Sequence, residues 1–270
     1  MDIAFTGGAV QAMIMSAVLC FIVPLIFLGY YKAKKDVKLS SFFIGIAFSF
    51  LFTFVGRSVL DWVFLLGFGL GNLLNLANHP VYVAVYSAVL SGFLAQIGSY
   101  IALKYCMKSR PGKENAFLLG LGKGGFECMI YGGIANIANV IMALLINAFG
   151  VEDYFARLGI PAEEAAAQQS AIAAQAAIPA SSILSDGTLQ FLAMWLNVAL
   201  TILVYVALTN KDCFYYLPAA ILLQIIGYVP IYLSQVGVLT SLTITMGITV
   251  GYIFAILVLV YRLYQSEKVK

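Results

Sequence analysis

Residues 116–149 read AFLLGLGKGGFECMIYGGIANIANVIMALLINAF, an apolar run that is interrupted by two charged side chains, Lys123 and Glu127. A helix that crosses a membrane needs roughly 20 consecutive, mostly apolar residues. This run is longer than that, so we expect a transmembrane helix that is tilted or kinked, or that has one end outside the bilayer. The run therefore indicates an integral membrane protein.

Six further stretches are also long and apolar enough to cross a bilayer. They cover residues 10–31, 41–66, 81–104, 187–209, 214–235 and 238–262. The chain of 270 residues is 62% hydrophobic and 10% charged, and its mean hydropathy is +0.96. Soluble domains average about 45–50% apolar and about 25% charged residues, so the composition excludes a soluble enzyme and a nucleic-acid binder. We predict an all-α, polytopic membrane helix bundle of about seven transmembrane helices, which forms one integral membrane domain over residues 1–270.

The basic residues predict the orientation of the bundle, because loops rich in Lys and Arg stay on the cytoplasmic side of a membrane. With the N-terminus outside, segments 32–38, 104–114, 210–213 and 262–270 lie inside, and these segments hold twelve of the fifteen basic residues. The twelve are Lys32, Lys34, Lys35, Lys38, Lys104, Lys108, Arg110, Lys113, Lys211, Arg262, Lys268 and Lys270. Of the remaining three, only Arg157 is external. We therefore predict an N-out/C-in topology.

The external loop over residues 150–186 contains a predicted short helix at about 160–178. Pro161 near the start, the acidic residues Glu163 and Glu164 in the first turn and the alanine run that follows all favour a helix. Pro179 ends it. We expect this extracytoplasmic helix to lie on the outer surface or to cap the bundle, with docking of a partner as the alternative.

Two pairs of opposite charges lie within the predicted spans, each four residues apart. Arg57 and Asp61 lie near the outer end of the second span, and we interpret them as a structural ion pair on one helix face. Lys123 and Glu127 lie deeper, in a segment with six glycines that permits close helix packing. Charged residues at this depth are functional candidates, and a mutually satisfied buried pair is the alternative interpretation.

Further polar residues fall at a similar depth when each span is counted from its cytoplasmic end at about 1.5 Å per residue. Gln96, Asn197 and Gln224 lie within about five residues of the depth of Lys123, and Glu127 lies one turn deeper. Isolated amides in a membrane core usually bind neighbouring helices. Their shared depth on several spans predicts one polar layer.

Three landmarks follow one another between the end of the second predicted span and the fourth. They are His79-Pro80 followed by Tyr82 and Tyr86, then Ser91-Gly-Phe-Leu-Ala-Gln-Ile-Gly-Ser-Tyr100, and then Gly122-Lys-Gly-Gly-Phe-Glu127. In this order they resemble the YhfC-type membrane proteins, a family of intramembrane metalloproteases akin to the CAAX-protease and bacteriocin-immunity group. The resemblance implies a multi-pass protein of a prokaryotic plasma membrane, and a site in which a glutamate activates water on a bound metal.

The chain departs from that family pattern at the positions that matter for chemistry. The resemblance assigns the site to Gln96, Ser99, Lys123, Glu127, Asn197 and Gln224. Family members carry Glu-Glu-x-Gly-Arg-Tyr where this chain has Ala95, Gln96 and Ser99, and His-Gly-Gly-x-Glu where it has Lys123 and Glu127. Later family histidines correspond to amides at two of the assigned positions, Asn197 and Gln224. The resemblance therefore implies a degenerate site with no metal and no other cofactor.

These departures favour a catalytically inactive homologue that binds a membrane protein or a lipid-like ligand in the former active-site cavity. Its expected partners are membrane lipid and another membrane protein, with no nucleic acid. One alternative is a transporter or channel that uses the Lys123–Glu127 pair. Another is an active intramembrane protease with non-standard residues, such as a dyad of Ser99 and Lys123.

Overall fold

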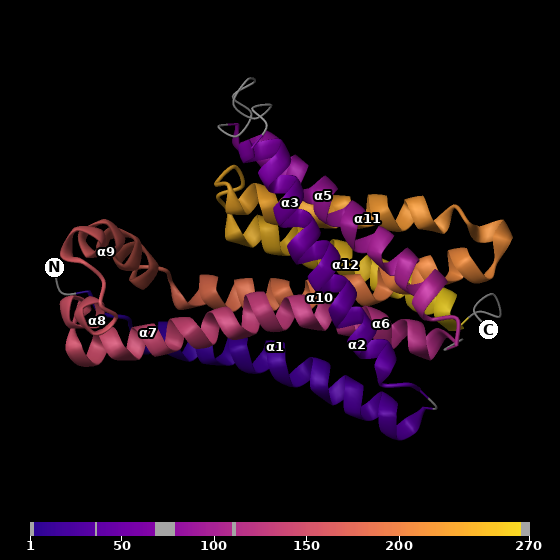
Figure 1. The fold of residues 1–270 in the computed structure, drawn as a ribbon, viewed down its shortest axis with the longest axis horizontal. Helices are drawn as coiled ribbons and strands as arrows, with labels where there is room; N and C mark the ends of the chain where they lie inside the picture. Colours follow the sequence, from indigo (N-terminus) through magenta and orange to yellow (C-terminus); the bar gives the residue numbers. More distant parts are fainter. Residues whose placement is uncertain (1–2, 36, 68–78, 110–111, 266–270) are drawn as a thin grey trace. The chain divides into compact units, whose positions relative to one another are not determined.

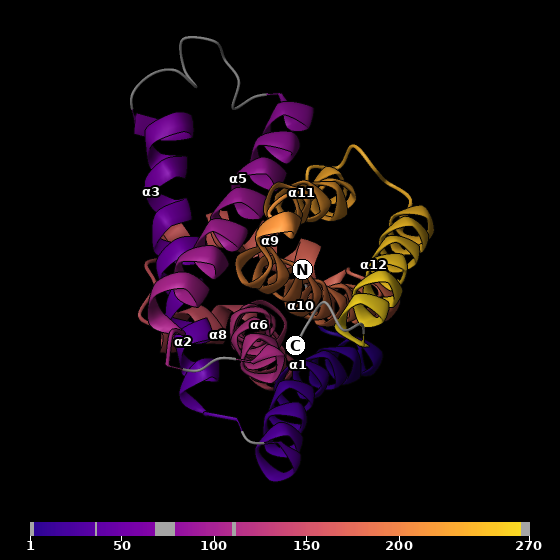
Figure 2. The same cartoon turned by 90° about the vertical axis from the view of Figure 1, so that its right-hand side faces the viewer.

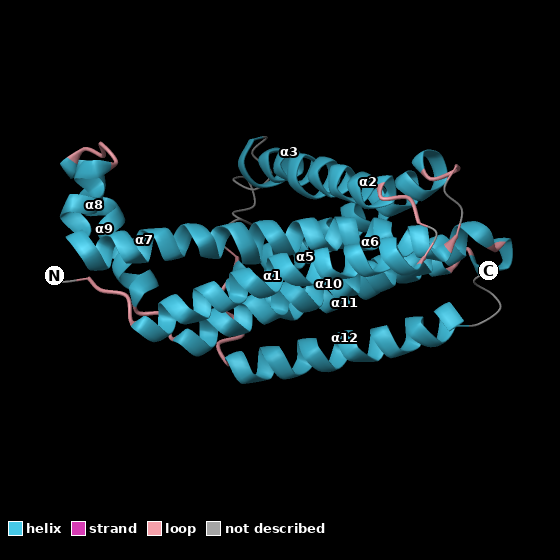
Figure 3. Ribbon diagram, turned by 90° about the horizontal axis from the view of Figure 1, so that it is seen from below, coloured by secondary structure: helices cyan, strands magenta, loops and turns pink. Residues whose placement is uncertain are grey.

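A computed structural model describes residues 3–35, 37–67, 79–109 and 112–265, and the regular structure in these ranges is helical throughout (Figure 3). The first half of the chain forms α1 (Gly7–Lys34), α2 (Ser40–Phe48), η1 (Ser49–Gly56), α3 (Arg57–Asp61), η2 (Trp62–Gly67), α5 (Pro80–Ile101), η4 (Ala102–Cys106) and α6 (Lys113–Cys128). The second half forms η5 (Met129–Ile134), α7 (Ala135–Phe149), α8 (Val151–Arg157), α9 (Ala162–Ala176), α10 (Ala180–Thr209), η6 (Lys211–Cys213), α11 (Tyr216–Gln235) and α12 (Leu242–Gln265).

Seven helices in the described ranges are long and apolar enough to cross a membrane, which confirms the predicted all-helical membrane architecture. The third begins at Pro80, because proline fits the first helical position, where its missing N–H needs no partner. The fifth begins at Ala180, seven residues before the predicted start at 187. Five of the seven extra residues are Ala, Ser or Asp, so the mean hydropathy of this stretch is low although it is compatible with a helix.

The run over residues 116–149 folds as one candidate span, Lys113–Phe149, made of α6, η5 and α7. η5 is a π-type segment that contains Gly132 and Gly133. π-type turns widen the helix and change its direction locally. The second span contains two such segments, η1 and η2.

Contacts divide the chain into two compact units. The first unit is Met1–Val23 with Cys128–Phe191, and the second is Pro24–Glu127 with Leu192–Lys270. The expectation of one domain over residues 1–270 stays a prediction.

In the first unit, the start of α1 packs with α7, α8, α9 and the start of α10 around a common apolar core. Its buried members are Phe5, Ala9, Ala12, Met13, Ala143, Ile146, Val151, Phe155, Ile172 and Ile183. The Asn147 side chain accepts from Phe5 N–H (2.8 Å) and donates to Phe5 C=O (2.9 Å), which fixes the chain before α1. The predicted helix at 160–178 is confirmed as α9, which starts directly after Pro161 and ends before Pro179 (Figure 1). Its external location stays a prediction.

In the second unit, α5 lies beside α11, and α12 lies along the other side of α11 (Figures 1 and 2). Gly92 on α5 permits this approach, because a Cβ there would lie 3.1 Å from Ile225 N and 3.3 Å from Ile221 O. The segment α2–η1–α3 packs against α5, where Phe52 covers Gly98. α5 is therefore held between two neighbouring spans.

The backbones of α2 and α6 approach each other closely. A Cβ on Gly122 would overlap the Phe42 carbonyl, and a Cβ on Gly45 would overlap the Leu119 carbonyl. Small residues allow such contacts between membrane helices, where close packing replaces the hydrophobic effect as the attraction. The glycines on α6 thus bring Lys123 into the interior of the unit, where 3% of its surface is exposed.

We expect Gly122→Ala to lower the free energy of unfolding by about 1–3 kcal/mol, because the added methyl group meets rigid backbone. Gly251→Ala is the matched control, since a Cβ at that position on α12 meets nothing within 4 Å. Thermal unfolding in detergent measures both. An equal melting temperature for the two variants would contradict the close α2–α6 crossing.

The N-out/C-in topology predicts opposite accessibility for two exposed positions, Gln168 on α9 and Ser109 after η4. Each is changed to Cys in a Cys106→Ser background, because Cys106 is an exposed native thiol. A membrane-impermeant maleimide added to intact cells should label position 168 and leave position 109 unlabelled until the cells are lysed. Labelling of position 109 in intact cells would reverse the orientation.

Candidate functional site

The predicted site residues lie in the second unit, and glycines on α6 determine how they face one another. Gly120 and Gly124 share the face toward α10, where a Cβ would lie 2.8 Å from Val198 Cα and 2.7 Å from Met194 O respectively. Gly122 faces α2. Lys123 and Glu127, one turn apart, therefore project between these two contacts into the helix bundle, and both are buried.

The Glu127 carboxylate accepts a hydrogen bond on each oxygen. Ser49 Oγ, at the start of η1, donates to Oε1 at 2.9 Å, and Asn197 Nδ2, on α10, donates to Oε2 at 3.2 Å. A charge in a low-dielectric interior is costly unless such partners surround it. The carboxylate therefore connects the second, fourth and fifth candidate spans.

A chain of amides extends from Glu127 across the unit. Gln224 Nε2 on α11 donates to Asn197 Oδ1 at 3.0 Å, and Gln96 Nε2 on α5 donates to Gln224 Oε1. The side chains of all three amides are shielded, with 0% of each residue exposed. The Tyr228 hydroxyl accepts a further bond from Asn197 Nδ2 at 3.2 Å. Glu127, Asn197, Gln224 and Gln96 thus form one hydrogen-bonded polar layer.

Lys123 has different partners from Glu127. Its ammonium donates to Ser99 Oγ at 2.8 Å and to the Ala95 carbonyl at 3.1 Å, both on α5. Although both charged residues are in the described part of the chain, they form no ion pair within 4.0 Å. Ser99 also donates to the Ala95 carbonyl at 2.9 Å and lies 3.4 Å from Thr201 Oγ1. Thr201 in turn donates to the Asn197 carbonyl, so the Lys123 cluster adjoins the polar layer at α10.

The other predicted pair, Arg57 and Asp61, is present as an ion pair with Nε–Oδ2 at 3.3 Å. Arg57 Nη1 also donates to Ser91 Oγ at 2.7 Å and to the Tyr232 hydroxyl. These contacts join α3 to α5 and α11. They support the interpretation of the pair as a structural link.

Three hydroxyl groups that belong to the site could not be recognised from the sequence, those of Ser49, Thr201 and Tyr228. Ser49 and Tyr228 contact the polar layer directly, and Thr201 contacts Ser99. Hydroxyl side chains are common in membrane helices because they can bond to their own backbone. No spacing distinguished these three from the others, so only the packing of the helices identifies them.

The family model described as YhfC intramembrane metalloprotease matches residues 19–249. A relative from Bacillus subtilis (strain 168), the uncharacterized membrane protein YhfC, is 23% identical over 232 residues, which cover 86% of this chain and 87% of that protein. No solved structure matches the chain.

A metalloprotease requires a bound metal ion, and such an ion needs ligands of a particular kind. A catalytic zinc takes three ligands from His, Asp, Glu or Cys and keeps one position for water. The described residues contain no group of three such side chains. Around Glu127 they place an ammonium group and three amides, and His79 is exposed at the start of α5. These side chains do not fit a zinc site.

We expect Lys123 and Glu127 to be energetically coupled despite their separate hydrogen bonds, because opposite charges one turn apart interact through a low-dielectric interior. Lys123→Met and Glu127→Gln should each destabilise the protein, and the double variant should lose less than the sum. A thermal double-mutant cycle measures the difference, for which we predict at least about 0.5 kcal/mol. Additive losses would show that the two charges act independently.

Proposed function

The chain belongs to the YhfC intramembrane metalloprotease family, and from this premise we propose that it is a catalytically inactive member that binds a membrane ligand instead of cleaving it. The observation that supports this proposal is the composition of the polar layer. Glu127 is the only carboxylate in it, and both of its oxygens already accept hydrogen bonds. The side chains beside it are amides and an ammonium group, which are not the usual ligands of a catalytic zinc.

The ammonium of Lys123 strengthens this argument. Lysine offers donors but no lone pair while it is protonated, and its positive charge repels a divalent cation. The bonds from Lys123 to Ser99 and Ala95 keep it between α5 and α6. A metal could enter this position only if the ammonium were displaced.

One atom in the layer is suited to ligand binding. Gln96 Oε1 is buried and accepts no hydrogen bond within the described structure. A buried acceptor without a partner costs roughly 1–3 kcal/mol, so a donor from a ligand would be stabilised there. Because the layer is fully buried, a ligand could reach Gln96 only if α5 moved away from α11. We propose a transmembrane segment of another membrane protein as this ligand, in the plasma membrane of a prokaryote.

Elemental analysis tests the loss of the metal site. We predict that the purified protein holds far less than one zinc per chain, whereas the variant Lys123→His/Asn197→His/Gln224→His gains about one. The three new imidazoles would join Glu127 as ligands, which completes the usual set of three or four. The gained zinc should disappear when Glu127→Gln is added. Stoichiometric zinc in the unmodified protein that is lost on Glu127→Gln would refute the proposal.

A second candidate function is favoured by one contact, the 2.8 Å between Lys123 Nζ and Ser99 Oγ. A lysine that accepts the proton of a neighbouring serine can activate that serine as a nucleophile. Here the lysine donates hydrogen bonds to both Ser99 and the Ala95 carbonyl, and the Ser99 hydroxyl donates to that same carbonyl. This arrangement supports a structural role for the contact more than a catalytic one.

A fluorophosphonate probe distinguishes the two candidates, because it reacts covalently with activated serines. The inactive-homologue proposal predicts no labelling that depends on Ser99 in detergent or in membranes. Labelling that disappears in both Ser99→Ala and Lys123→Met, while Thr201→Val retains it, would establish the hydrolase instead.

A further inference from the structure

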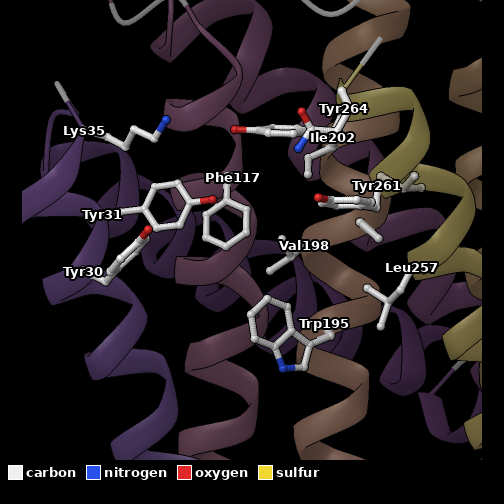
Figure 4. A pocket seen from close by; sticks show the side chains of 13 residues that line it. Tyr30, Tyr31, Lys35, Phe117, Trp195, Val198, Ile202, Leu257, Tyr261 and Tyr264 are labelled. Atoms are coloured by element: carbon white, nitrogen blue, oxygen red, sulfur yellow. The ribbon is translucent and has the colours of Figure 1, made fainter.

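A cavity of about 340 Å³ lies in the second unit, on the side of α10 opposite to the polar layer. Within α10, Trp195, Val198, Ala199 and Ile202 line the cavity, whereas Asn197 bonds into the polar layer. The other walls come from the end of α1, from Phe117 on α6 and from the last turns of α12 (Figure 4). Small-molecule sites typically have volumes of about 300–1,000 Å³, so the cavity is large enough for part of a ligand.

One wall of the cavity is aromatic. Tyr31 and Phe117 are stacked with ring centroids 4.2 Å apart, and Phe117 lies 6.3 Å from the Trp195 ring. Val198 and Leu257 add aliphatic surface (Figure 4). These apolar side chains could pack against a hydrocarbon chain.

The charged group of the cavity lies at one end. Figure 4 shows Lys35 and Tyr264 at the end opposite to Trp195, with the Tyr264 hydroxyl directed into the cavity. Among the thirteen lining residues, all of them described, Lys35 carries the one formal charge. Lys113 Nζ donates to the Tyr264 carbonyl at 3.0 Å and lies 4.7 Å from the centre of its ring. The carboxylate of Glu114 is also near Tyr264 and offsets the charge of Lys113, so the net positive charge at this end comes from Lys35.

A long apolar cavity with a cation at one end is complementary to an amphiphile with a negatively charged headgroup. Tyrosine, tryptophan and lysine at helix ends are typical of the depth at which lipid headgroups lie. Basic pockets between membrane helices bind anionic headgroups. We propose that this cavity binds an anionic phospholipid, with one acyl chain along Phe117 and Trp195 and the phosphate beside Lys35. The site is separate from the polar layer, so the inference holds whether or not that layer is catalytic.

Trp195 provides a direct probe, because the sequence has two tryptophans and the other, Trp62, can be replaced by Phe. The full chain with Trp62→Phe is placed in vesicles of unbrominated phosphatidylcholine and titrated with lipids brominated on the acyl chain, which quench tryptophan on contact. We expect brominated phosphatidylglycerol to quench Trp195 at a several-fold lower mole fraction than brominated phosphatidylcholine.

Two lysine variants decide whether the preference arises in the cavity. Lys35→Gln should make the two brominated lipids equivalent. Lys34→Gln, the matched control, removes a neighbouring exposed lysine that does not line the cavity, and it should leave the preference intact. Both positions are on the surface, so neither change should prevent folding. Equal quenching by the two lipids in the parent protein, or an equal loss of preference in both variants, would overturn the proposal.

Discussion

The carboxylate of Glu127 is enclosed among membrane helices, where only protein groups can solvate it, and the arrangement of the second unit follows from that constraint. Its partners come from η1 and α10, and the amide chain then continues to α11 and α5. Membrane helices lack a hydrophobic attraction for one another, so close packing and hydrogen bonds hold them together. The glycines of α6 provide the close packing, and the polar layer provides the hydrogen bonds.

If the chain is the inactive member that we propose, the same bonds explain how the scaffold of the family can persist without the chemistry. In a metal site, the carboxylate and imidazoles leave one position open for water. Here each Glu127 oxygen and each side-chain oxygen of Asn197 and Gln224 accepts a hydrogen bond from a neighbouring helix. Amides can replace metal ligands in this way because each carries both a donor and an acceptor. On that proposal, hydrogen bonds between side chains join the helices where family members would use an ion.

Much of the fold could be predicted from the sequence, because hydropathy over about 20 residues depends on local composition alone. Counting depth along each span also grouped Gln96, Asn197 and Gln224, which the structure joins in one chain of bonds. The depth count did not predict the partner of Lys123, and the sequence suggested its contact with Ser99 only as an alternative dyad. Its spacing to Glu127 indicated an ion pair, but helix rotation and crossing place Ser99 nearer to the ammonium, and neither is encoded in a depth count.

Gln224 provides the most direct test of the polar layer, because it bonds to amides on two other helices. Gln224→Leu keeps the volume similar but leaves Asn197 Oδ1 and the Gln96 amide without their partner. The unfolding free energy in bicelles, measured by steric trapping, should fall by at least about 1 kcal/mol, since buried polar groups without partners are costly. Unchanged or increased stability would contradict the claim that this layer holds the helices together.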